Sequence, residues 1–77
     1  MTLHAAIGRI MDNAEAINAL CDSRNLAPDD SLRVRSHRMH GELLVHGITE
    51  PAEIIRVIAS RLDQEQERIA DARRVGA

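Results

Sequence analysis

Three histidines, His37, His40 and His46, have a spacing that could serve metal binding. His37 and His40 are three residues apart, so on a helix they share one face, and Glu42 or Cys21 could add a ligand. A zinc site needs three or four convergent ligands, and the chain lacks the HExxH motif of metalloproteases. We interpret the histidines as solvent-exposed side chains of a polar helix face, with a metal site as the alternative. We therefore expect no cofactor.

The same segment contains the one local cluster of positive charge, formed by Arg33, Arg35 and Arg38. Guanidinium groups form bidentate hydrogen bonds with carboxylates and phosphates. The whole chain has 10 basic and 12 acidic residues and no aromatic residue, which disfavours a nucleic-acid partner. These arginines could simply lie on a solvated helix face. If they contact a partner, we expect an acidic protein. A nucleic-acid-associated regulator is an alternative.

Catalytic groups form no recognisable pattern in this sequence. Cys21 lies on an apolar helix stripe, where a thiol acts as a small apolar side chain, and the adjacent Asp22 disfavours a thiolate. No Ser-His-Asp order or Gly-rich phosphate loop is present. The single cysteine cannot form an internal disulfide, and no signal peptide or apolar run of ~20 residues is visible. The sequence predicts a cytoplasmic, non-enzymatic protein without a membrane partner.

A first helix is predicted over residues 3–24. Its apolar residues recur at intervals of three or four and form one stripe, which consists of Leu3, Ile7, Ile10, Ala14, Ile17 and Cys21. This spacing is typical of an amphipathic helix with one packing face. Thr2 is placed to cap its N-terminus.

A second, shorter helix is predicted after Pro28, with a weaker apolar stripe. Three good N-cap residues follow this proline: Asp29, Asp30 and Ser31. Gly41 costs roughly 1 kcal/mol in a helix interior, so the helix could stop near His40. We prefer a continuous helix that ends at Gly47, because Gly is favoured just past a helix end.

A third, long helix is predicted to begin after Thr49, which can cap it, with Pro51 in its first turn. Its stripe consists of Ile55, Ile58, Leu62, Glu65, Ile69, Ala72 and Gly76. This spacing is typical of a seam between helices. Glu65, the one acidic residue of this stripe, either marks the end of the buried region or sets a register against a partner. We interpret the four large aliphatic residues, Ile55, Ile58, Leu62 and Ile69, as partner-binding anchors.

The helix lengths differ in a way that predicts association. At ~1.5 Å per residue the three helices span about 33, 24 and 37 Å, so the middle helix is too short to cover both long stripes. Hydrophobic residues make up 44% of the chain, but none is aromatic, which limits the core. We therefore expect one all-α domain over residues 1–77, in which the two long helices form a hairpin-like seam and the shorter middle helix bridges them. It would act as an adaptor, regulator or inhibitor, as a homodimer or on a larger protein.

Part of the first helix is similar to a known enzyme family. The segment from Arg9 to Arg24, followed by Asn25-Leu26-Ala27, resembles the opening helix of the all-helical chorismate mutases. The resemblance implies a three-helix dimer and an enzyme alternative, in which Arg24, with Arg9 and Gln64, surrounds a dicarboxylate. The family's site includes a lysine, whereas this chain has none.

Overall fold

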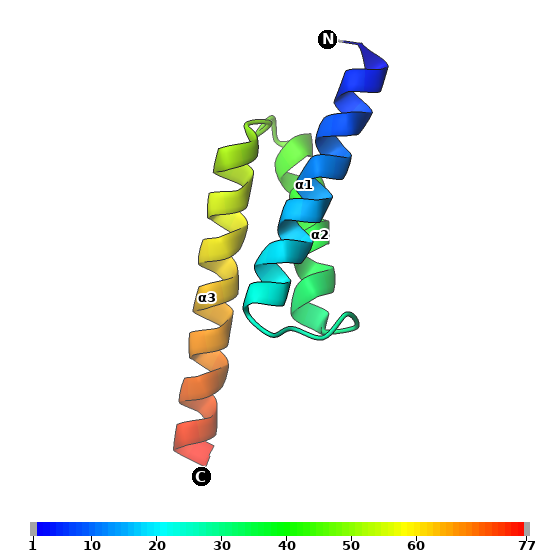
Figure 1. The fold of residues 1–77 in the computed structure, drawn as a ribbon. Helices are drawn as coiled ribbons and strands as arrows, with labels where there is room; N and C mark the ends of the chain where they lie inside the picture. Colours follow the sequence, from blue (N-terminus) through cyan, green and yellow to red (C-terminus); the bar gives the residue numbers. More distant parts are fainter. Residues whose placement is uncertain (1, 77) are drawn as a thin grey trace.

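The computed structural model describes residues 2–76 and consists of three helices and two short loops (Figure 1). The helices are α1 (Leu3–Ser23), α2 (Ser31–Val45) and α3 (Pro51–Gly76). They contain 21, 15 and 26 residues, so the predicted order of long, short and long helices is confirmed. Within the described residues there is no strand, and no helix is apolar over enough of its length to cross a bilayer.

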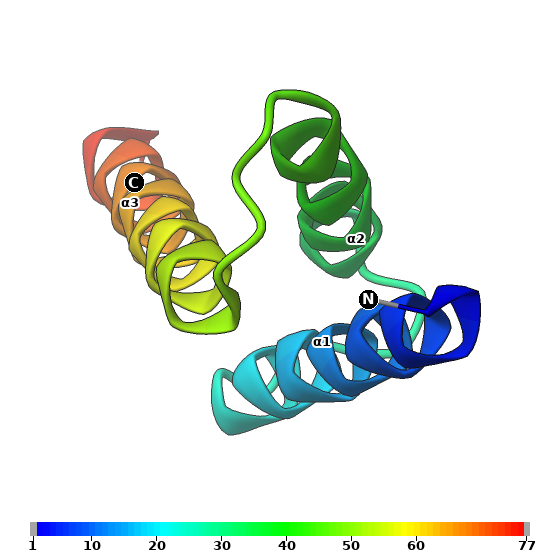
Figure 2. The ribbon, with the colours of Figure 1, turned by 90° about the horizontal axis from the view of Figure 1, so that it is seen from above.

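The three helices stand at the corners of a triangle when seen along the bundle (Figure 2). α1 and α3 run in the same direction and α2 runs against both. Every pair of helices is in contact. The middle helix is therefore a full packing partner of two parallel long helices, whereas the sequence predicts a hairpin-like seam between the long helices that the middle one bridges.

Local backbone hydrogen bonding explains where the helices begin. The Thr2 hydroxyl accepts a hydrogen bond of 3.2 Å from a backbone N–H of the first turn of α1, as predicted. Among the three candidates before α2, Asp30 is the cap, and its carboxylate accepts from a backbone N–H at 2.9 Å. α3 begins at Pro51, two residues after Thr49, where the missing N–H of proline costs nothing.

The first two helices end in the same way, with a residue in the left-handed region. Asn25 has a φ of 59° and Gly47 a φ of 86°. The next backbone N–H, of Leu26 or Ile48, reaches back to a carbonyl five residues earlier at 3.1 or 2.9 Å. This is the Schellman arrangement, which satisfies carbonyls at a helix end. α2 therefore continues through Gly41 and stops where the sequence predicted.

The core lies where the three helices overlap. Its buried members are aliphatic or sulfur-containing: Ile17, Cys21, Leu26, Leu32, Ile54, Ile58 and Leu62. The placement of Cys21 in the core is confirmed, with 0% of the residue exposed.

Two helix ends extend beyond this overlap in opposite directions (Figure 1). The longest dimension of the molecule is 53 Å, whereas α3, its longest helix, spans ~39 Å. At one end lies the N-terminal segment of α1, residues 3–12, and at the other the C-terminal segment of α3, residues 70–76. The long helices are therefore staggered, and each has a part that its neighbours do not cover.

Candidate functional site

Arg33 is a buried arginine that bonds to its own chain. Its guanidinium donates a hydrogen bond of 2.7 Å to the Asp22 carboxylate and others to the backbone carbonyls of Leu26 and Ala27. Only 9% of the residue is exposed. These carbonyls belong to the loop between α1 and α2, so Arg33 holds that loop against α2. This placement corrects the sequence analysis, which expected Arg33 to contact a partner.

Arg35 and Arg38 are both exposed on α2. One guanidinium nitrogen of Arg35 lies 3.8 Å from the Glu65 carboxylate, a loose ion pair at the surface. Arg38 has no carboxylate within 4 Å in residues 2–76. Exposed pairs contribute about 0–1 kcal/mol, so neither arginine is strongly held. A contact with an acidic partner stays a prediction for these two.

The four aliphatic residues predicted as partner anchors pack inside the bundle. Ile58 and Leu62 are 1% and 3% exposed, and Ile55 and Ile69 are half-buried against the same core. α1 and α2 cover this side of α3, because the bundle closes around it. Ile58 and Leu62 therefore offer almost no surface to a partner, and partner binding by Ile55 and Ile69 stays a prediction.

The three histidines lie in different environments. His46 is exposed at the C-terminal end of α2, and His37 bonds to Asn18 on α1 at 2.8 Å. His40 is buried, which corrects the interpretation of an exposed face, and its Nε2 lies 3.4 Å from the side-chain nitrogen of Asn13. Burial, and to a lesser extent His37, lowers the pKa of His40. No three His, Cys, Asp or Glu side chains gather into a metal site in the described part of the chain.

Four of the seven exposed large apolar side chains of residues 2–76 lie on the N-terminal segment of α1. Leu3, Ile7, Ile10 and Met11 are 78, 49, 47 and 61% exposed. Leu3, Ile7 and Ile10 continue, at helical spacing, the face that Ile17 presents to the core. The sequence predicts this stripe, but the partner-binding anchors are predicted on α3. The length of the stripe relative to the short second helix was the signal that could have located it.

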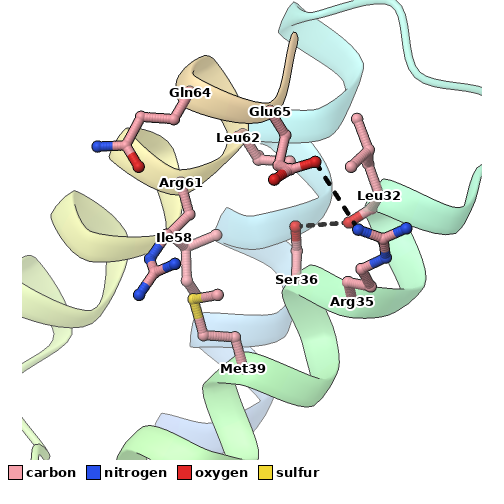
Figure 3. A pocket seen from close by; sticks show the side chains of 9 residues that line it. All are labelled: Leu32, Arg35, Ser36, Met39, Ile58, Arg61, Leu62, Gln64 and Glu65. Atoms are coloured by element: carbon pink, nitrogen blue, oxygen red, sulfur yellow. Dashed lines mark hydrogen bonds and ion pairs between the residues drawn. The ribbon is translucent and has the colours of Figure 1, made fainter. Parts of the chain in front are cut away.

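A pocket of about 220 Å³ lies between α2 and α3 (Figure 3). Its walls include the apolar side chains of Met39, Ile58 and Leu62, and Arg35 and Arg61 approach it from opposite helices. The Ser36 hydroxyl in it donates to a carbonyl of its own helix at 2.8 Å. A larger and more polar pocket of about 530 Å³ continues past Arg35 towards the loop between α1 and α2.

Glu65 is the carboxylate in this pocket, and several arginines surround it. Arg68 donates a hydrogen bond of 2.8 Å to its Oε2, and Arg35 lies 3.8 Å from the same oxygen. The hydrogen bond from Arg68, with the charges of Arg68, Arg35 and Arg61, lowers the pKa of Glu65. Glu65 therefore joins α3 to α2 by charge rather than by burial.

The positions implied by the chorismate mutase resemblance do not converge within the chain. Arg24 makes a bidentate pair with Asp63 at 2.8 and 3.2 Å, which raises the pKa of Arg24. Arg9 lies fifteen residues earlier on α1, about 22 Å away along the helix axis. Gln64 lines the pocket between α2 and α3. These side chains lie in three separate parts of the surface.

Comparison of this chain with protein-family models, with curated proteins and with solved structures finds no match. The chorismate mutase alternative therefore gains no support from a relative. The exposed surfaces of this chain are therefore the basis for proposing a function.

Proposed function

We propose that this chain is a non-enzymatic helical interaction module that self-associates through the N-terminal segment of α1. The observation that carries the proposal is the exposed apolar stripe of Leu3, Ile7, Ile10 and Met11. Leu3, Ile7 and Ile10 lie in line with Ile17, which is fully buried, so one helix face is packed in one half and half-exposed or more in the other. A contiguous exposed apolar face is typical of a surface that contacts another protein.

A second copy of the chain fits this stripe best. The segment extends about 15 Å along its axis, and at this end of the molecule neither α2 nor α3 accompanies it (Figure 1). A twofold axis brings the same stripe of two copies face to face, so one surface supplies both sides of the interface. The length mismatch among the helices predicts the same association. We also propose a cytoplasmic location, which the single free cysteine favours.

The expected dimer is weak. Complete burial of an Ile, Leu or Met side chain contributes about 1.5–3 kcal/mol, and these four are already partly covered. Association costs at least ~4 kcal/mol, because each chain loses translational and rotational freedom, and this cost offsets much of that gain. We expect a dissociation constant on the order of 10–100 µM.

Sedimentation equilibrium tests the proposal with two matched variants. Ile7→Glu places a charge in the stripe, whereas Val75→Glu places the same charge at an exposed apolar residue of the other helix end. Wild type and Val75→Glu should approach the dimer mass as concentration rises from ~5 to ~500 µM, and Ile7→Glu should stay a monomer. A wild-type chain that remains monomeric throughout this range would contradict the proposal.

A further inference from the structure

The helix α3 lies beside only part of α1. Arg24 on α1 pairs with Asp63 on α3 at 2.8 Å, and the two helices run in the same direction (Figure 1). Pro51, the first residue of α3, lies twelve residues before Asp63, and Asp12 lies twelve residues before Arg24. Because both helices rise ~1.5 Å per residue, α3 begins about level with Asp12. The whole exposed stripe of α1 lies beyond that level, where α3 no longer accompanies it.

The buried half of the same face decides how a second copy can lie on the stripe. Ile17 and Cys21 continue the stripe and are fully buried in the core, where the three helices meet. A copy of α1 that ran parallel to the first would follow this face into the space that α2 and α3 occupy. A copy that ran antiparallel would instead lead away from the bundle past Leu3. The fold therefore permits the antiparallel arrangement and excludes the parallel one.

The length of the uncovered segment sets the register. An antiparallel helix can advance along the stripe until its first turn reaches the start of α3, level with Asp12. The N-cap of the second copy then lies beside Asp12 of the first, and twofold symmetry places the axis midway, at Ile7. In this register Leu3 of each copy lies against Ile10 and Met11 of the other. All four stripe residues are then covered.

The charges at this end of the bundle complement the end of the incoming helix. The first turn of α1 contains no acidic residue, so nothing in it offsets the positive end of its helix dipole. Glu50, just before α3, and Glu53, in the first turn of α3, are both exposed where this positive end would arrive. Glu53 also offsets the dipole of α3 itself, which leaves Glu50 for the second copy.

We infer that the two copies of α1 run antiparallel across a twofold axis at Ile7, and that the first turn of each copy lies near Glu50 of the other. The inference rests on the proposed self-association and adds the orientation and register of the partner. It yields an elongated dimer, with the two bundles at opposite ends and the two N-terminal segments of α1 between them.

Isotope-filtered NOE spectroscopy of an equal mixture of labelled and unlabelled chain at ~1 mM, well above the expected dissociation constant, tests this arrangement. The antiparallel register predicts contacts between copies from Leu3 to Ile10 and Met11, and from Ile7 to Ile7. A dimer that instead shows Leu3-to-Leu3 contacts would overturn this inference and leave the proposed self-association intact. A chain without contacts between copies that is also monomeric by sedimentation at this concentration would overturn both.

Matched variants test the charge at the end of the interface. Glu50→Gln should weaken dimerisation at least ~3-fold at low ionic strength, because each dimer contains the contact with a helix N-terminus twice. Glu67→Gln removes the same charge from an exposed position of α3 far from this end, and it should dimerise like wild type. Circular dichroism checks that both variants keep their helices. Equal dissociation constants for the two variants would contradict the placement of the first turn of α1 near Glu50.

Discussion

The two helix ends that leave the bundle differ in what they expose. The N-terminal segment of α1 presents Leu3, Ile7, Ile10 and Met11. In the C-terminal segment of α3 every residue is exposed as well, but its only large apolar side chain is Val75. An ion pair between Arg74 and Asp71, three residues apart, lies on that surface instead. The two overhanging ends therefore have unequal surfaces, one apolar and one charged.

This difference shows that helix length alone does not create an interface. Mismatched lengths predict that part of each long helix is uncovered, and both ends are. A charged end is stable in water, because exposed polar side chains need no protein partner and pairs three residues apart add a few tenths of a kcal/mol. Covering the apolar end lowers the free energy, whereas covering the charged end does not. The assignment of an interaction surface therefore rests on the residue types of each end.

The largest contrast is expected along the single stripe of α1. Ile17→Ala should lower the free energy of unfolding by about 3–4 kcal/mol, because it leaves a cavity in a fully buried site. Ile7→Ala, at a half-exposed site on the same face, should cost less than ~1 kcal/mol at concentrations where the chain is monomeric. Urea unfolding of both variants measures the difference.

If Ile17→Ala does not fold, Ile17→Val provides the milder comparison, with an expected cost of about 1 kcal/mol. Equal destabilisation by Ile7→Ala and Ile17→Ala at low concentration would mean that the N-terminal segment already packs within one chain.

A smaller contrast is expected between two arginines of α2. Arg33→Ala should destabilise the fold by about 2 kcal/mol, because it leaves the carbonyls of Leu26 and Ala27 without their donor. Arg38→Ala should change stability by less than ~0.5 kcal/mol, since its side chain is exposed and unpaired within residues 2–76. Thermal unfolding at one pH compares them directly. A neutral Arg33→Ala would show that the loop between α1 and α2 needs no such support.

The smallest effect concerns pH. Burial lowers the pKa of His40 below its ordinary value of 6.5, so the unfolded chain binds a proton that the folded chain rejects. Stability should therefore be full above pH ~6.5 and decline as the pH falls below it. The Asp63 and Glu65 carboxylates have lowered pKa values, so their contributions are lost only at pH values below their ordinary ones of 3.8 and 4.5.

A matched pair of variants identifies the responsible histidine. His40→Gln should flatten the decline in unfolding free energy between pH 7 and pH 5, and His46→Gln, at an exposed site, should keep it. An unaltered pH profile in His40→Gln would show that His40 is not the group that titrates.

The helices could be predicted because the relevant signals are local. The three-and-four spacing along α1, the Thr2 cap and the Gly47 stop each act within a few residues, and the structure confirms all three. Asn25 also ends a helix in the left-handed region, which any L residue other than Asn or Asp rarely adopts. These features depend on the chain only within one or two turns.

The inner face of α2 could not be predicted, because its polar residues have distant partners. Its buried residues are Leu32, Arg33, Ser36 and His40. Arg33 bonds to the preceding loop, and His40 lies against Asn13, 27 residues earlier. A periodicity analysis treats such residues as an exposed face, because it assumes that buried positions are apolar. The pocket could not be predicted for the same reason, since Arg35 and Arg61 line one cavity only once α2 packs on α3.

Hydrogen exchange at the two helix ends, measured at several protein concentrations, shows whether a second copy covers the stripe of α1. A second copy that covers the stripe should slow amide exchange in residues 3–12 as the concentration rises from ~5 to ~500 µM, and leave residues 70–76 unchanged. Exchange that is independent of concentration at both ends, or that slows equally at both, would contradict the assignment of the α1 stripe as the interface.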